Sequence, residues 1–317
     1  EDLQRSGQHP FWDRDEVHEI YAEWRRLFDE YHPPRAAVAE ACVHPSRRTR
    51  YASPSGLGQA FNFDLLQADW SPEQFRRVVA DNLDAAETSG ASSTWVLSNH
   101  DVVRHATRYG LPRGEGDSGQ DGKQWLLTDG SDPVLDREAG LRRARAASLL
   151  LLALPGSAYL YQGEELGLHE VADLPVDTLQ DPAFRRSGGA EKGRDGCRVP
   201  LPWTAHEPSF GFGAGACHLP QPAWFGDVAA QSQAGDPEST LTMYRTALRL
   251  RRRLQGAERL EWVPSPDSVL HFVRPGGWRC VTNFGSEHAD LPAGEVVVSS
   301  GPLTGGRLPG DTTVWLA

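Results

Sequence analysis

Four short apolar runs constrain the fold of this 317-residue chain. Each run is followed at once by polar residues, and helical patterns precede the first run and separate the second, third and fourth runs, whereas a loop rich in Ser, Pro and Gly joins the first run to the second. Short apolar strands that alternate with helices pair in parallel through right-handed crossovers. We therefore predict an α/β fold. A barrel and a doubly wound sheet both give this alternation, and the long segments after the runs favour the barrel. The runs are residues 36–39, 60–63, 94–98 and 157–162.

Helical patterns precede the first run and follow the second, third and fourth runs. Ser71 followed by Pro72 is typical of a helix start, and Asp13 with Glu16 resembles a capping box. Residues 165–237 form a long irregular stretch rich in Pro and Gly, and a loop of this length in a compact enzyme is usually functional. We expect helices over residues 13–31, 71–88, 136–154 and 236–254.

The pattern of apolar and polar residues changes after residue 257. Short alternating runs are separated there by Gly and Pro, a pattern typical of antiparallel strands. We therefore expect residues 258–317 to form a small β domain. The strand-like runs are residues 269–274, 279–283, 295–299 and 312–316.

Charge and composition exclude several classes of partner. The net charge of −11 disfavours binding to nucleic acid, and no apolar run approaches the roughly 20 residues that a membrane-spanning helix needs. The four cysteines lack the close spacing of a metal site, so we expect buried or half-buried thiols in a reducing compartment and a cytoplasmic protein without cofactor or metal. A neutral sugar is compatible with this surface.

Two carboxylates end apolar runs. Glu40 follows the first run, and Asp101 follows the third run within Asn99-His100-Asp101. Retaining glycoside hydrolysis needs two carboxyl groups about 5 Å apart, and a barrel supplies such groups from the ends of different strands. Position alone leaves another interpretation open, in which Glu40 is a salt-bridged structural residue.

Several segments, in order, resemble the α-amylase family of glycoside hydrolases (glycoside hydrolase family 13). Residues 94–104, Thr-Trp-Val-Leu-Ser-Asn-His-Asp-Val-Val-Arg, resemble the end of its seventh barrel strand. Residues 39–41 and 60–64 resemble its fifth and sixth strands, and residues 161–167 resemble its eighth. Residues 193–203, Gly-Arg-Asp-Gly-Cys-Arg-Val-Pro-Leu-Pro-Trp, resemble the α-glucosidase and oligo-1,6-glucosidase branch.

The resemblance implies both a fold and an activity. Residues 1–257 would form the carboxy-terminal half of a (β/α)8 TIM barrel, about strands 5–8 with the long loop 165–237. Residues 258–317 would form a small antiparallel β-sandwich. The activity would be that of a retaining glycoside hydrolase of α-glucosidase type, acting on small α-linked gluco-oligosaccharides.

The resemblance also implies roles for individual residues. Glu40 would be the acid/base, and Asp101 would be the carboxylate that binds sugar hydroxyls and stabilises the distorted ring. His100 would donate to the hydroxyls of the same sugar, and Arg104 would hold either that sugar or the Asp101 carboxylate. In the long loop, Trp203 and Trp224 are candidates for stacking on sugars, with packing as the equal alternative.

One family feature is missing. The nucleophile of the family is an Asp two residues after an Arg, on a strand that should precede the helix at residues 13–31, and no such run occurs there. We therefore expect this chain to be a fragment that is inactive alone. Two alternatives stay open: a transglycosylating or isomerising relative that acts on trehalose or sucrose, and a non-catalytic carbohydrate-binding or partner subunit. The sequence upstream of Glu1 would discriminate the enzyme from the partner subunit.

Overall fold

A computed structural model describes residues 7–112 and 122–317. The helices are α2 (Val17–Asp29), α3 (Pro45–Ala52), α4 (Asp64–Gln67), α5 (Pro72–Ser89), α6 (His105–Arg108), α7 (Lys123–Leu127), α8 (Arg137–Ala153), α9 (Pro182–Arg186), α10 (Ala230–Gln233) and α11 (Thr240–Leu254). The strands are β1 (Thr94–Val96), β2 (Ser157–Tyr159), β3 (Glu261–Trp262), β4 (Val269–Val273), β5 (Arg279–Asn283), β6 (Ala289–Asp290), β7 (Val296–Ser299), β8 (Arg307–Leu308) and β9 (Thr312–Leu316). Short 3-10 turns are η2 (Glu164–Leu166), η3 (Val176–Thr178), η4 (Asp195–Arg198), η5 (Pro208–Gly211) and η6 (Ala223–Gly226).

The four apolar runs lie side by side as two parallel pairs. β1 pairs in parallel with β2, with Thr94 opposite Ser157, and Ala39 forms a parallel bridge with Ala60. The Thr94 hydroxyl joins the two pairs, because it donates to the Ala60 carbonyl at 2.6 Å and accepts the N–H of Asn62 at 3.1 Å. Parallel pairing, predicted from the alternation, is thus observed for both pairs.

One face of these strands is concave. Gln59 precedes the Ala39–Ala60 bridge, and its amide nitrogen donates to the Ser157 hydroxyl at 2.6 Å. The Tyr159 hydroxyl donates to the amide oxygen of Gln59, also at 2.6 Å, and its ring lies 4.6 Å from that of Phe61. β1 lies between these partners, and neighbouring strands are about 4.8 Å apart. Direct contact across an intervening strand therefore requires a sheet curved toward this face.

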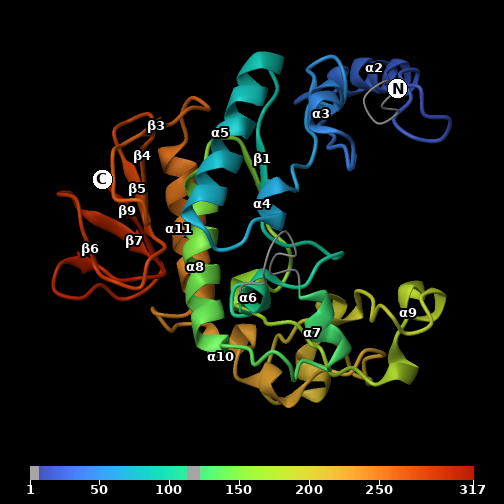
Figure 1. Ribbon diagram of the computed structural model, residues 1–317, viewed down its shortest axis with the longest axis vertical. Helices are drawn as coiled ribbons and strands as arrows, with labels where there is room; N and C mark the ends of the chain where they lie inside the picture. Colours follow the sequence, from blue (N-terminus) through green and yellow to red (C-terminus); the bar gives the residue numbers. More distant parts are fainter. Residues whose placement is uncertain (1–6, 113–121) are drawn as a thin grey trace.

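Helix α8 occupies the centre of the described chain (Figure 1). The Asp136 carboxylate caps it by accepting the N–H of Ala139 at 2.9 Å, as expected for a helix that starts there. Eleven of its 17 residues are buried, because it packs against the parallel strands on one side and against the β-sheet on the other. Trp95 of β1 and Leu150 of α8 belong to this shared core, together with Phe272 of β4 and Trp315 of β9.

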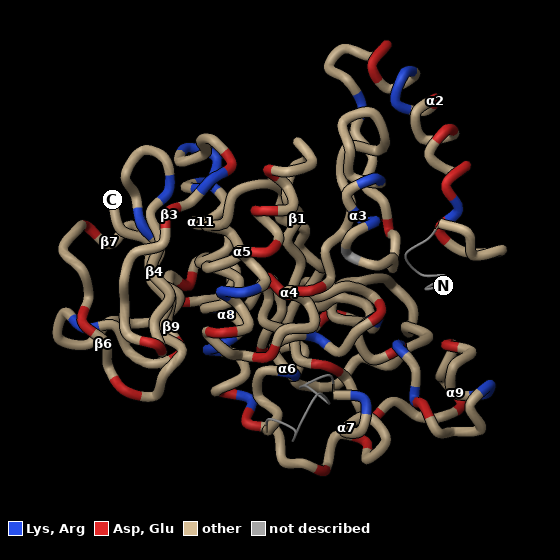
Figure 2. The backbone as a smooth tube through the Cα atoms, turned by 45° about the horizontal axis from the view of Figure 1, so that its top comes forward, with Lys and Arg blue, Asp and Glu red and all other residues tan. Residues whose placement is uncertain are grey.

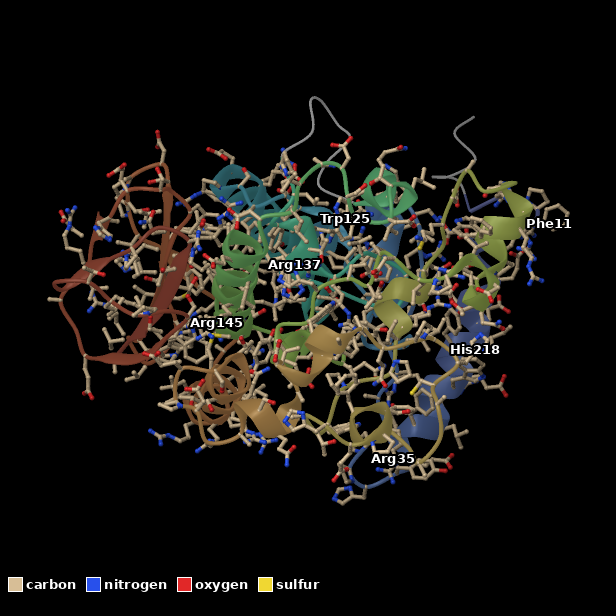
Figure 3. The ribbon with its side chains drawn as sticks, turned by 90° about the horizontal axis from the view of Figure 1, so that it is seen from below. Phe11, Arg35, Trp125, Arg137, Arg145 and His218 are labelled. Atoms are coloured by element: carbon tan, nitrogen blue, oxygen red, sulfur yellow. The ribbon has the colours of Figure 1, made fainter. Side chains whose placement is uncertain are left out.

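The carboxy-terminal strands form a five-stranded antiparallel sheet in the order β3-β4-β5-β9-β7. Its second face packs against the two-stranded sheet β6-β8 through an apolar cluster that includes Leu308. The Thr313 hydroxyl and the Trp315 indole N–H donate to carbonyls of α8 at 2.8 and 3.1 Å. Arg145 of α8 donates in the other direction, to the Ser300 carbonyl at 2.7 Å (Figure 3).

Two predicted helix starts are wrong. Helix α2 begins at Val17 instead of following a capping box, because the Asp13 carboxylate instead accepts hydrogen bonds from Arg47 and from the Tyr51 hydroxyl of α3. Helix α11 begins three residues after Pro237, since Ser239 caps it by accepting the N–H of residue 242 at 3.2 Å. Helix α3 was not predicted.

Helix α2 has an exposed apolar face. Ile20, Trp24 and Leu27 are each about half exposed, whereas Val17 and Tyr21 on the other side pack against the α3 cluster. The helix lies at the end of the molecule opposite the five-stranded sheet in both views (Figures 1 and 2). Within the described ranges, the structure holds no helix long and apolar enough to cross a membrane.

Candidate active site

The polar residues that follow the parallel strands leave the sheet at one edge. Ala39, Ala60, Thr94 and Ser157 lie at the same level across the four strands. Because the strands are parallel, the residues that follow this level, among them Glu40, emerge on one side. This is the edge at which parallel barrels place their functional groups.

Asp101 is the centre of a charge cluster at this edge. Arg194 Nη1 donates to its Oδ1 at 2.7 Å, and Arg198 Nη2 donates to the same oxygen at 3.1 Å. His100 Nε2 lies 3.5 Å from it, and the backbone N–H of Asp101 donates to the Asn99 side chain at 2.8 Å. Hydrogen bonds between ionised groups are about twice as strong as neutral ones, so the carboxylate is held in one orientation while 32% of its side chain stays exposed.

Sequence reasoning missed Arg194 and Arg198 as site residues, although it recognised the motif 193–203. A further bond runs from Arg198 Nε to the His100 carbonyl at 2.9 Å, so the long loop closes on the end of the β1 segment at two points. The two guanidiniums belong to the short 3-10 turn η4 and its first flanking residue. The available signal was the spacing of two arginines four residues apart in a motif already assigned to one branch of the family.

Arg104 lies beneath the site. Its side chain is buried, and its guanidinium donates to the carbonyls of Gln162 and Cys197, both at 2.9 Å, while it packs 5.0 Å from the Tyr161 ring. The expected pairing of Arg104 with the Asp101 carboxylate is wrong, because backbone carbonyls occupy this guanidinium. A direct contact between Arg104 and sugar stays a prediction, and the burial favours a supporting role.

Among the described residues, the Glu40 side chain shares no hydrogen bond or ion pair with the cluster around Asp101. The residue is exposed and follows Ala39, whose backbone N–H and carbonyl both pair with the neighbouring strand at 2.9 Å. Within residues 7–112 and 122–317, no hydrogen bond or ion pair is found for its carboxylate. Cys42, one of the four cysteines expected to be buried or half-buried, is exposed as well, because sheet pairing ends at Ala39. The convergence of Glu40 and Asp101 on one sugar stays a prediction.

A cleft of about 890 Å³ opens beside Asp101, within the size range of small-molecule sites. Its wall includes Arg194 and Asp181 of the long loop and Leu127 of α7. Its floor includes Glu170, whose carboxylate accepts the backbone N–H of Arg104 at 2.9 Å. Burial raises the pKa of Glu170 to about 7. Glu40 does not line this cleft.

A second buried carboxyl group lies behind the strand ends. Glu164 accepts a hydrogen bond from the Tyr244 hydroxyl at 3.2 Å, and its other oxygen lies 4.0 Å from His105 Nδ1. Burial raises the pKa of Glu164 to about 8 and lowers that of His105 to about 3. Both groups are therefore neutral near pH 7, which fits a structural role. Among the described residues there is no cluster of three His, Cys, Asp or Glu side chains able to hold a metal ion.

The two candidate stacking residues differ in their environment. Trp203 is 51% exposed. Trp224 is partly buried, with its ring 4.6 Å from Phe225 and with the Arg137 guanidinium of α8 over it at 5.5 Å. Packing accounts for Trp224, so stacking on sugar stays a prediction for Trp203 alone.

Comparison with known proteins shows which family the chain is similar to. The profile of the alpha amylase catalytic domain matches residues 130–258. Over 293 residues the chain is 33% identical to a probable alpha-glucosidase of Rhizobium meliloti (strain 1021). It is 29% identical over 311 residues to a salivary alpha-glucosidase of Anopheles gambiae. The chain is similar to the α-amylase family of glycoside hydrolases.

The chain spans about half the length of these relatives. The alignments cover 88% and 92% of the chain but 48% and 46% of the relatives. A solved structure of an alpha-glucosyl transfer enzyme, XgtA, superposes with a TM-score of 0.75 at 30% identity, covering 98% of this chain and 56% of that one. An isomaltulose synthase mutant of Erwinia rhapontici shares the fold, with a TM-score of 0.73 at 20% identity over 96% of this chain and 58% of that one.

Proposed function

We propose that this chain carries the acid/base side of a retaining α-glucosidase-type active site for small α-linked gluco-oligosaccharides. The observation that carries the proposal is the position of the Asp101 carboxylate. Arg194 and Arg198 hold it beside His100, at the strand edge where Glu40 also emerges. Carboxylates at the carboxyl ends of different parallel strands are what glycoside hydrolysis on a barrel requires.

The proposed fold is the carboxy-terminal half of a (β/α)8 barrel at residues 1–257, followed by a β-sandwich domain at residues 258–317. The curvature toward Gln59, Phe61 and Tyr159 supports the barrel, since inward side chains of alternate barrel strands share layers. The packing of β6-β8 on the five-stranded sheet supports the sandwich.

The chain's own residues would act as follows. The Glu40 carboxyl group protonates the glycosidic oxygen as the bond to the leaving group breaks, and its carboxylate later takes a proton from the attacking water. The Asp101 carboxylate accepts hydrogen bonds from ring hydroxyls, and His100 donates to hydroxyls of the same sugar. Arg194 and Arg198 hold the Asp101 carboxylate in one orientation through hydrogen bonds to Oδ1.

The nucleophile is not supplied by this chain. The family places it two residues after an Arg, and no Arg-x-Asp occurs at any position of the sequence. Retaining hydrolysis needs both carboxylates, so we expect no hydrolysis of maltose by the chain alone.

The test compares the chain with a hybrid in which it replaces the aligned half of the Rhizobium meliloti relative, with glucose release from maltose as the readout. The hybrid should be active and the chain inactive. Glu40→Gln in the hybrid should lower kcat by about 10²–10⁴-fold, and Glu287→Gln, at an exposed carboxylate of the β domain, should leave kcat unchanged. Turnover by the chain alone that Glu40→Gln abolishes would refute the missing nucleophile. Full activity of the Glu40→Gln hybrid would refute the acid/base assignment.

Glucosyl transfer is the second candidate, because the chain is 30% identical to an alpha-glucosyl transfer enzyme over 98% of its length. Products of the hybrid would be resolved by chromatography at rising maltose concentration. Oligosaccharides longer than maltose that exceed free glucose would favour transfer. Maltose binding without any product would favour the non-catalytic alternative.

A further inference from the structure

Arg194 lies between two carboxylates of different burial. The Asp181 side chain is 1% exposed, and that of Asp101 is 32% exposed. Arg194 Nε and Nη2 both donate to Asp181, the second at 3.3 Å. Only Nη1 reaches Asp101, at 2.7 Å. The buried carboxylate therefore takes two contacts of the guanidinium and the exposed one takes a single contact.

Backbone N–H groups hold the Asp181 carboxylate in the position from which it contacts Arg194. Its carboxylate accepts the N–H of Ala183 at 3.0 Å and that of Arg194 at 3.0 Å. Asp195 in turn accepts the N–H of Asp181 at 2.9 Å. Gly193 has a φ of +89°, and a Cβ at this residue would lie 2.8 Å from the Cβ of Asp181, so only glycine allows the two segments to approach. The Asp181–Arg194 pair is thus built by the fold of the loop.

The geometry limits how Arg194 can meet Asp101. Arg198 and Arg194 donate to the same oxygen, Oδ1. Guanidinium–carboxylate pairs frequently form two parallel hydrogen bonds that occupy both oxygens. Asp181 holds the Nε and Nη2 edge of Arg194, and in this orientation only Nη1 reaches Asp101.

We propose that Asp181 is a positioning residue that restricts Arg194 to one contact and so keeps Oδ2 of Asp101 available to a sugar hydroxyl. The inference rests on the proposed function and deepens it, since it names the residue that leaves one oxygen of the Asp101 carboxylate available to the sugar. The Arg194 guanidinium lowers the pKa of Asp181 to about 2, so this carboxylate is charged at every pH at which a glycosidase of this kind would work.

The test uses Asp181→Asn, Arg194→Ala and the double variant of the chain. Asparagine keeps an acceptor for the N–H of Ala183 and removes the charge that holds Arg194. The first readout is the ¹³Cγ NMR signal of Asp101, assigned by its loss in Asp101→Asn, and the second is the Kd for maltose from NMR titration. Asp177→Asn, at an exposed carboxylate of the same loop, is the matched control.

In Asp181→Asn, the Asp101 signal should move and maltose binding should weaken about 5- to 10-fold. In the Arg194→Ala background the same substitution should move neither readout, and Asp177→Asn should be silent in both backgrounds. Equal weakening in both backgrounds, or an unmoved Asp101 signal, would overturn the proposal. If the signal responds as expected and the unmodified chain binds no maltose, the positioning of Arg194 stands and the proposed function fails.

Discussion

Replacement of Glu164 by glutamine should remove a pH-dependent loss of stability. The Glu164 side chain is 3% exposed, and burial raises the pKa of its carboxyl group to about 8 from an ordinary value of 4.5. Between these two values the folded chain holds a proton that the unfolded chain releases. The free energy of unfolding therefore falls as pH rises from 4.5 to 8 and is insensitive to this group outside that window.

The magnitude follows from the shift. One pKa unit corresponds to about 1.4 kcal/mol, so Glu164 should cost roughly 4 kcal/mol between pH 5 and pH 8. That is a large part of the 5–15 kcal/mol that typically stabilises a folded protein. His105, whose pKa burial lowers to about 3, acts in the opposite sense below pH 6.5, and its effect is common to both variants in a comparison with Glu164→Gln.

Glutamine has nearly the same shape, stays neutral and keeps an oxygen that can accept the Tyr244 hydroxyl hydrogen bond. Glu164→Gln should match the parent within about 1 kcal/mol at pH 5 and exceed it by about 4 kcal/mol at pH 8. Urea unfolding followed by tryptophan fluorescence at pH 5, 6, 7 and 8 gives the difference. Glu287→Gln, at an exposed position, is the control and should show no such trend. A difference that stays constant across these pH values would refute the argument from burial.

Three further outcomes follow from the described contacts. The pKa of Asp181 is lowered to about 2 from 3.8. The charged carboxylate therefore stabilises the folded chain fully above pH 4, and this stabilisation is lost as pH falls toward 2. Asp181→Asn should flatten this part of an acid-unfolding curve followed by circular dichroism. Trp224→Ala should cost about 3 kcal/mol in urea unfolding because its ring packs on Phe225, whereas exposed Trp203→Ala should cost less than about 0.5 kcal/mol. Leu150→Ala, in the core shared by helices and sheet, should cost about 3 kcal/mol and lower the thermal midpoint of both together.

Elements with a strong local signal could be predicted from the sequence. Ser71 caps α5 through the N–H of Gln74, and Asp136 caps α8, as their positions indicated. The strand runs at residues 269–274 and 312–316 became β4 and β9. These signals are local because hydrogen bonds within one turn and the alternation of side chains depend on neighbouring residues.

Features made by distant partners could not be predicted. Arg194 is 93 residues from Asp101 in the sequence. Neither the spacing of apolar residues nor the capping residue of a helix predicts that contact. The capping box at Asp13 failed for the same reason, since Arg47 of α3 competes for its carboxylate. The motif at residues 193–203 identified the branch of the family, but only the fold of the loop shows which carboxylate its arginines reach.

The shared core around α8 bears on how such chains can be recombined. Trp315 and Thr313 of the last strand hydrogen-bond to the backbone of α8, more than 150 residues away. A β domain transplanted from a relative would have to match the shape of that helix as well as the junction near residue 257. Substitutions in α8 and in the terminal sheet are thus coupled, so the sheet would have to be exchanged together with the helix that it covers.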